Sequence, residues 1–183
     1  MTALAVGRRR TPRSFGAYAQ IEAANVFLIP AFALWLAWPR GAFEYVAMSL
    51  AIAACSGFLV VGALYWRSVH RRLQTPGTSS RRAPAFADRA EKPLLGLTVA
   101  ATVATAGILI RDGFTASAVA AGSLTLLAAL EYVNYYRVQL QHFDNVADFR
   151  RLLSMRRLKR AHMARELAAY RARRALTGKR VAD

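Results

Sequence analysis

The 183-residue chain is 55% hydrophobic, yet its 26 basic and 10 acidic residues give a formal net charge of +16. Soluble domains are about 45–50% apolar and about 25% charged, whereas only 20% of this chain is charged. The composition therefore disfavours a single soluble domain and predicts apolar segments joined by basic ones. A single cysteine, Cys55, excludes an intramolecular disulfide and a CxxC site. Because the three histidines are far apart in the sequence, we expect neither a structural metal nor a cofactor.

Four apolar segments are long enough to cross a bilayer as helices, which takes about 20 residues each. They cover residues 18–38, 43–66, 93–110 and 114–136. The connections after the first and third segments are very short, so we expect two hairpins, over residues 18–66 and 93–136. The first segment is too long for a signal peptide and lacks a small-residue cleavage site. The sequence thus predicts an all-α, polytopic membrane protein with four transmembrane helices.

The basic residues predict how these helices are oriented. All 26 Lys and Arg residues except Arg40 and Arg111 lie in residues 1–17, 67–92 and 137–183. Because basic loops are retained in the cytoplasm, we expect both termini on the cytoplasmic side of a cell membrane. Residues 67–92 also contain Pro, Gly and Ser and are predicted to form a flexible linker between the hairpins.

Small residues at four-residue spacing predict the faces on which the helices pack, since close approach contributes much to helix association in lipid. These stripes are Ala47, Ala51 and Cys55; Gly96, Ala100 and Ala104; and Ala118 with Gly122. A second stripe contains Thr98, Thr102 and Thr105, whose hydroxyls can bond to their own helix or to a neighbour. We interpret it as a packing feature rather than an ion path.

Proline 30 falls in the middle of the first apolar segment. It removes one backbone donor and leaves the carbonyl of Val26 without its helical partner. We expect a kink there, with Asn25 positioned to satisfy a freed backbone group.

Two glutamates lie inside the predicted spans near their cytoplasmic ends. Glu22 is followed three residues later by Asn25, and Glu131 by Asn134. This spacing places each pair on one helix face, and Tyr135, one turn after Glu131, shares that region. Since a charged group in a membrane is costly, we predict that these five residues meet between the first and fourth spans as an intramembrane polar cluster.

Three interpretations of this cluster remain open. In the first, the carboxylates pair with Arg67 and Arg137 at the cytoplasmic boundary and fix helix register. In the second, they form a proton or cation site. In the third, they support catalysis in a cleft. The first interpretation is favoured because it requires no additional ligand.

The C-terminal segment, residues 137–183, is predicted to contain a basic amphipathic helix that begins after Asp144 or Asn145. We expect it to lie on anionic lipid headgroups at the cytoplasmic face. Docking on a protein partner is the alternative, and nucleic acid is disfavoured for want of a binding motif. The expected lipid or partner contacts are Phe149, Arg150, Arg151, Leu153, Arg156, Arg157, Lys159 and Arg160.

Catalytic motifs such as a Walker loop, a nucleophile elbow or HExxH do not occur. The sequence therefore favours a non-enzymatic accessory, scaffold or regulatory component of a membrane assembly, joined to a protein partner or to further copies of itself. The alternative is a small oligomeric transporter or channel that uses the polar cluster.

Overall fold

The computed structural model describes residues 12–75, 82–138 and 160–182. Its helices are α1 (Pro12–Leu36), α2 (Ala42–Gln74), α3 (Arg82–Asp112), α4 (Ala116–Tyr136) and α6 (His162–Ala182). Four of them, α1 to α4, are long and apolar enough to cross a membrane. The prediction of an all-α fold is therefore confirmed, and the four long apolar helices support a multi-pass membrane protein.

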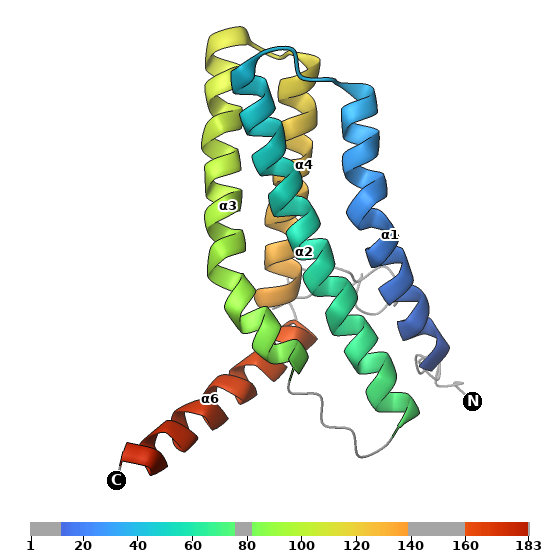
Figure 1. Cartoon of the computed structure of the whole chain (residues 1–183), viewed down its shortest axis with the longest axis vertical. Helices are drawn as coiled ribbons and strands as arrows, with labels where there is room; N and C mark the ends of the chain where they lie inside the picture. Colours follow the sequence, from blue (N-terminus) through green and yellow to red (C-terminus); the bar gives the residue numbers. More distant parts are fainter. Residues whose placement is uncertain (1–11, 76–81, 139–159, 183) are drawn as a thin grey trace, which may run out of the picture.

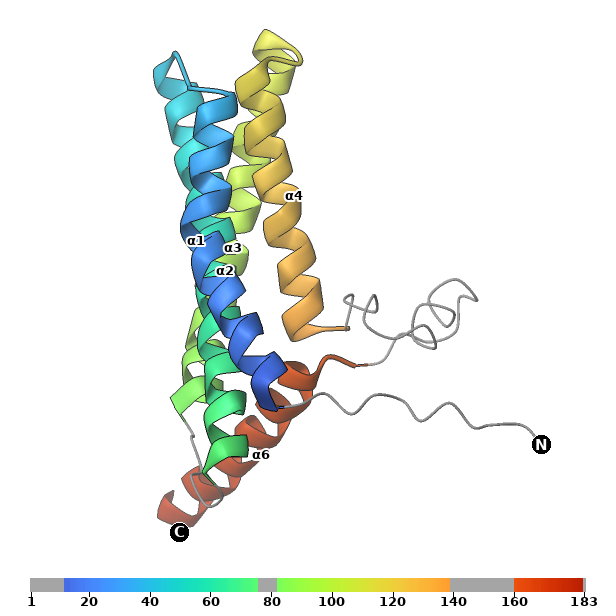
Figure 2. The same ribbon diagram turned by 90° about the vertical axis from the view of Figure 1, so that its right-hand side faces the viewer.

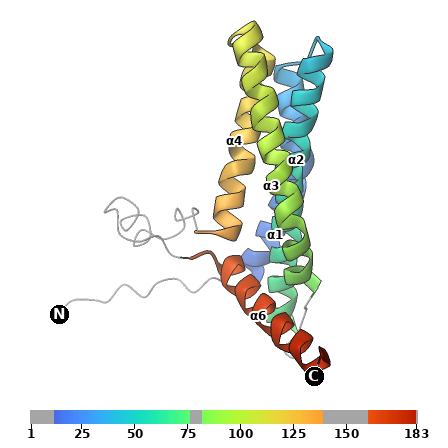
Figure 3. The same cartoon turned by 90° about the vertical axis from the view of Figure 1, so that its left-hand side faces the viewer.

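Helix α2 is the centre of the bundle, because it packs against α1, α3 and α4. Helices α1 and α3 lie on either side of α2 (Figure 1). Helix α4 contacts α3 and, to a smaller extent, α1. The short connections α1–α2 and α3–α4 lie at the same end of the bundle (Figure 2). Helix α6 crosses the opposite end obliquely and lies against α3 (Figure 3).

Large side chains are divided between a tight interior and an apolar exterior. Phe58 and Tyr65 of α2 are fully buried. By contrast, Phe27 and Trp35 of α1 are 76% and 79% exposed, and Val103 and Ile110 of α3 are also turned outward. Large exposed apolar surfaces of this kind mark contact with a membrane or with another protein.

The predicted packing stripes are correct for α2 and wrong for α3. Ala51 and Cys55 are fully buried as expected, but Gly96 and Ala100 lie on the exposed side of α3. The buried face of α3 instead carries Leu94, Thr98, Ala101, Thr105 and Ile108. The small residues of α2 provide the physical reason: the side chain of Leu94 fills the space that a Cβ atom at Gly57 would need.

The carbonyl group that loses its helical hydrogen bond at Pro30 is satisfied by a residue of α2, not by Asn25 as we expected. Pro30 lies inside α1, and the carbonyl oxygen of Val26, four residues earlier, accepts a hydrogen bond of 3.1 Å from the hydroxyl of Ser56 on α2. Asn25 has no hydrogen bond to any residue that the structure describes. The proline thus creates an acceptor that ties α1 to α2.

The predicted flexible linker over residues 67–92 was largely wrong, because helices occupy most of it. Helix α2 continues to Gln74 and α3 begins at Arg82. Pro84 falls in the first turn of α3, where backbone N–H groups have no helical partner and proline is tolerated. With 33 residues, α2 is about 50 Å long, against a hydrocarbon core of about 30 Å. Helix α2 is therefore longer than a membrane-spanning helix needs to be.

Local hydrogen bonds stabilise the two short connections, α1–α2 and α3–α4, at the opposite end of the bundle. The hydroxyl of Thr115 accepts a hydrogen bond of 3.1 Å from the backbone N–H of Ala118 and caps α4. Gly113 precedes it with a φ of +74°, which suits a residue without a Cβ atom. At the start of α2, Glu44 accepts a hydrogen bond of 2.8 Å from the backbone N–H of Arg40. These contacts stabilise both short connections.

Candidate functional site

A buried hydrogen bond joins α1 to α4 at the predicted polar cluster. The hydroxyl of Tyr135 donates to Oε1 of Glu22 over 2.7 Å. Glu22 is only 6% exposed and Tyr135 only 3%. Two of the residues that the sequence singled out, from segments more than 110 positions apart in the chain, are thus in direct contact.

The position of Tyr135 depends on a glycine of the central helix. A Cβ atom built on Gly62 of α2 would lie 2.1 Å from the Tyr135 hydroxyl oxygen and 2.6 Å from the ring carbon that carries it. Any larger residue at Gly62 would therefore occupy the space of the phenol. Three helices meet at this point, with Glu22 on α1, Gly62 on α2 and Tyr135 on α4.

Glu131 completes the cluster from the same helix as Tyr135. Its carboxyl group interacts with Asn134 and Tyr135 and lies within electrostatic range of Glu22. Its Oε2 atom is buried and has no hydrogen-bond partner among the described residues. Asn134 is buried as well. Two carboxyl groups therefore share the environment of one tyrosine hydroxyl, which is an arrangement that can hold a proton or a small cation.

The favoured interpretation of the cluster, pairing with Arg67 and Arg137, was wrong. Arg67 is exposed and has no ion pair to a residue in the described ranges. Arg137 is also exposed; it donates a hydrogen bond of 2.9 Å to the hydroxyl of Tyr132 and lies over that ring. Both arginines are exposed, whereas the side chain of Glu22 and the Oε2 atom of Glu131 are buried.

Helix α6 forms the second notable feature, a layer fixed to the end of the bundle. Arg171 binds Asp88 over 2.6 Å and also binds Glu91, both on α3. Arg174 lies 3.5 Å from Asp88. The hydrogen bonds to Glu91 and Asp88 raise the pKa of the Arg171 guanidinium above its ordinary value. The acidic side chains at the start of α3 are thereby paired with α6.

Apolar contacts and a second set of polar contacts support this docking. Met163 and Leu167 of α6 are buried in the main core of the bundle. The hydroxyl of Tyr65 is hydrogen bonded to His162, and Arg72 pairs with Glu166 over 3.1 Å. Met163 and Leu167 of the described helix are thus covered by the protein itself, whereas Leu176 nearer its end is exposed.

Most of the residues predicted to contact lipid or a partner lie outside the described residues. This holds for Phe149, Arg150, Arg151, Leu153, Arg156, Arg157 and Lys159. Arg160 is described and exposed. It forms an isolated antiparallel bridge with Val138, and the backbone N–H of Ala161 bonds to the carbonyl of Arg137. The start of α6 is therefore fixed beside the end of α4.

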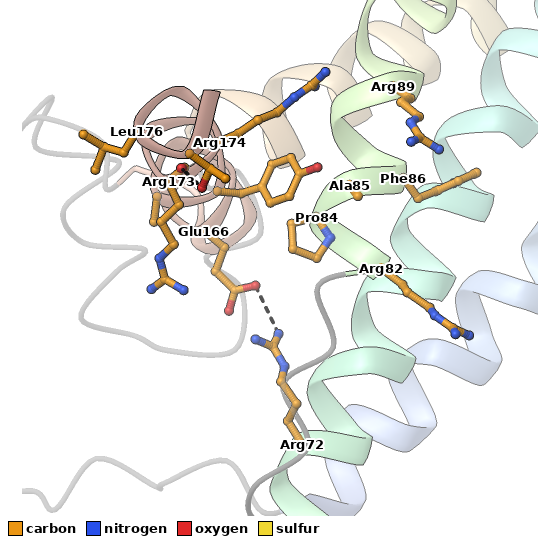
Figure 4. Close-up of a pocket in the computed structure, with 13 residues that line it drawn as sticks. Arg72, Arg82, Pro84, Ala85, Phe86, Arg89, Glu166, Arg173, Arg174 and Leu176 are labelled. Atoms are coloured by element: carbon orange, nitrogen blue, oxygen red, sulfur yellow. Dashed lines mark hydrogen bonds and ion pairs between the residues drawn. The ribbon is translucent and has the colours of Figure 1, made fainter. Parts of the chain in front are cut away.

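A basic groove of about 1120 Å³ lies between α6, the C-terminal end of α2 and the N-terminal end of α3. Its charged lining consists of Arg72, Arg82, Arg89, Arg173, Arg174 and a single acid, Glu166. Pro84, Phe86 and Leu176 contribute apolar surface (Figure 4). The Arg72–Glu166 ion pair spans the space between the two walls (Figure 4).

The chain matches no protein-family model, no curated protein and no solved structure. In the part of the chain that the structure describes, no group of three or more His, Cys, Asp or Glu side chains could hold a metal ion.

Sequence reasoning identified Glu22, Glu131, Asn134 and Tyr135 but missed the residues that position them and the residues that dock α6. Gly62 carried no local signal, because its importance lies in the approach of a side chain from α4. The acids Asp88 and Glu91 were assigned to a linker. A helical reading of residues 82–92 would have placed both on one face, three residues apart.

Gly62→Ala should displace the Tyr135 ring, break its bond to Glu22 and lower the free energy of unfolding by about 1–3 kcal/mol, the usual range for overpacking. Thermal unfolding of the detergent-solubilised protein measures this loss. Gly96→Ala is the matched control, because nothing lies within 4 Å of a Cβ atom at Gly96. Equal stability of Gly62→Ala and Gly96→Ala would contradict the three-helix contact.

Proposed function

We propose that this chain is a multi-pass protein of the cell membrane, with both termini in the cytoplasm, that serves as a non-enzymatic accessory or regulatory component of a membrane assembly. In this proposal α1 to α4 anchor the protein, and α6 with the projecting ends of α2 and α3 forms a docking surface for a protein partner.

The docking of α6 is the observation that carries this proposal. Arg171 is held by two acids of α3, and Leu167 is buried in the bundle core. A cytoplasmic helix fixed in this way presents a rigid basic surface next to the membrane. Rigid surfaces bind partners at a lower entropic cost than segments that must order on binding.

Charge complementarity defines the expected partner. Arg165 and Arg173 of α6 are exposed, and neither has an ion pair to a described residue. An acidic cytoplasmic segment of a neighbouring subunit would match this surface and would be attracted to it electrostatically.

Arg171→Glu should undock α6 by placing like charges opposite Asp88 and Glu91, and affinity purification from native membranes should then lose the stoichiometric partner. Combining this change with Asp88→Arg and Glu91→Arg restores opposite charges and should restore recovery. Arg40→Glu, at the other end of the bundle, is the control and should recover the partner normally. Recovery of only the homo-oligomer from the unchanged protein would refute the accessory role.

A second function, proton or cation transport by an oligomer, is favoured by one specific observation. Glu131 has a buried carboxylate oxygen without a hydrogen-bond partner among the described residues, close to the buried carboxyl of Glu22. Two carboxyl groups within a membrane need a neutralising proton or cation, since charge there is costly.

If transport occurs, liposomes containing the purified protein should show a proton or monovalent cation flux that Glu22→Gln or Glu131→Gln abolishes. The amide keeps an acceptor oxygen for Tyr135 while removing the titratable group, so the helices should still assemble. Glu44→Gln, at the outer end of α2, should leave the flux intact. Absence of flux from the unchanged protein across a pH gradient and a K⁺ gradient would eliminate this function.

A further inference from the structure

The hydroxyl group of Tyr135 has two carboxyl groups as neighbours but only one hydrogen to donate. That hydrogen is directed at Oε1 of Glu22, over 2.7 Å. Glu131 interacts with the same hydroxyl. An ionised carboxylate only accepts hydrogen bonds, whereas a protonated carboxyl group also donates one. While Tyr135 donates to Glu22, Glu131 can therefore bond to the Tyr135 oxygen only if Glu131 itself carries a hydrogen.

A negative charge on Glu131 would be poorly stabilised where this side chain lies. Its Oε2 atom is buried and accepts no hydrogen bond from a described residue. A buried acceptor without a partner costs about 1–3 kcal/mol, and a charged one costs more. Protonation of the carboxyl group removes the charge and with it much of this cost.

The groups that face the two carboxyls from the surrounding helices contain no base. Glu22 is influenced by Tyr135, and Glu131 by Glu22, Asn134 and Tyr135. From α2 the titratable neighbour is the fully buried thiol of Cys55, and among the described residues α3 contributes no titratable group. Burial and mutual repulsion therefore oppose a charge on both carboxyls. One proton on the pair leaves a single charge, which the Tyr135 hydroxyl stabilises.

The cluster is better suited to a proton than to a metal cation. A cation would coordinate the carboxyl oxygens, but it would not supply a hydrogen between Glu131 and the Tyr135 oxygen. The phenol also has little room to move toward α2, because a Cβ atom on Gly62 would lie only 2.1 Å from its hydroxyl oxygen. The count of donors and the packing of the ring both favour a proton.

We propose that Glu131 holds a proton and donates it in a hydrogen bond to Tyr135, whose own hydroxyl hydrogen is donated to the ionised carboxylate of Glu22. Tyr135 then bridges two carboxyl groups that carry one negative charge between them. The inference rests on the buried cluster of the second proposed function and identifies its ion as a proton. It does not require that the protein transports this proton.

Infrared spectroscopy of the delipidated full-length protein, in a detergent without carbonyl groups, detects a protonated carboxyl group directly. At about pH 6.5 an ordinary carboxyl group, with a pKa of about 4, is ionised. We expect a single carboxylic-acid C=O band, which moves to lower frequency in heavy water because its proton exchanges. Glu131→Gln should remove this band completely. Glu44→Gln, at the other end of the bundle, is the control and should leave it unchanged.

Glu22→Gln distinguishes the two carboxyl groups of the cluster. Its amide oxygen still accepts a hydrogen bond from Tyr135, so the band should persist in this variant. In Glu131→Gln the new amide can donate to the Tyr135 oxygen in place of the proton. Thermal unfolding in detergent should therefore show that Glu131→Gln is as stable as the unchanged protein.

Three spectroscopic results would overturn the proton site. They are absence of the band from the unchanged protein, its persistence in Glu131→Gln, and its loss when choline chloride is replaced by an equal concentration of NaCl or KCl, which would indicate a cation site. Comparison with the liposome flux separates this proposal from transport. A band without flux would support the proton site and eliminate transport, whereas flux without a band would overturn the proton site and leave transport standing.

Discussion

Lipid offers no hydrogen-bond partner to a polar side chain, so the position of Glu22 depends on the hydroxyl of Tyr135. The 2.7 Å bond between them connects α1 to α4, which otherwise share a limited contact. Gly62 of α2 leaves room for the phenol, so the same contact fixes three helices. Because Ser56 of α2 also bonds to the carbonyl freed by Pro30, α1 is held by polar contacts at two levels.

The end of the bundle that carries α6 is stabilised by different interactions from the rest of the bundle. Within the bilayer, apolar side chains such as Phe27 and Val103 face outward. At the end of the bundle beside α6, Arg171 joins α6 to α3 through Asp88 and Glu91, and the Arg72–Glu166 ion pair joins α6 to α2. Ion pairs at an exposed surface are individually weak. The burial of Met163 and Leu167 therefore supplies much of the attachment.

The two features are linked through α2 and α4. Tyr65 lies one turn from Gly62 on α2 and is hydrogen bonded to His162 at the start of α6. On α4, Tyr136 follows Tyr135 and donates a hydrogen bond of 2.9 Å to the carbonyl of Ala87 on α3. Gly62 and Tyr135 of the buried cluster are therefore within one helical turn of Tyr65 and Tyr136, which contact α6 and α3. This proximity offers the proposed regulatory role a physical route between the buried cluster and α6.

The sequence predicted the four spans because their apolar length is a local property, and it predicted the meeting of Glu22, Glu131 and Tyr135 because depth and helical spacing follow from the span limits. Features that depend on contacts between helices were not predictable in this way. The favoured arginine pairing failed because Arg67 and Arg137 are exposed, and Arg137 contacts Tyr132 instead. Ser56 and Gly62 matter only through residues of other helices, and the contacts that Arg72, Asp88 and Glu91 make within residues 67–92 come from α6, far along the chain.

A double-mutant cycle between Glu22→Met and Tyr135→Phe measures the central contact most directly. Unfolding free energies of the four proteins in detergent give the coupling between the two side chains, free of their separate packing effects. The three-helix contact predicts a stabilising coupling of about 1 kcal/mol or more, as expected for a buried hydrogen bond to a carboxyl group. Additive effects of the two changes, with no coupling, would contradict it.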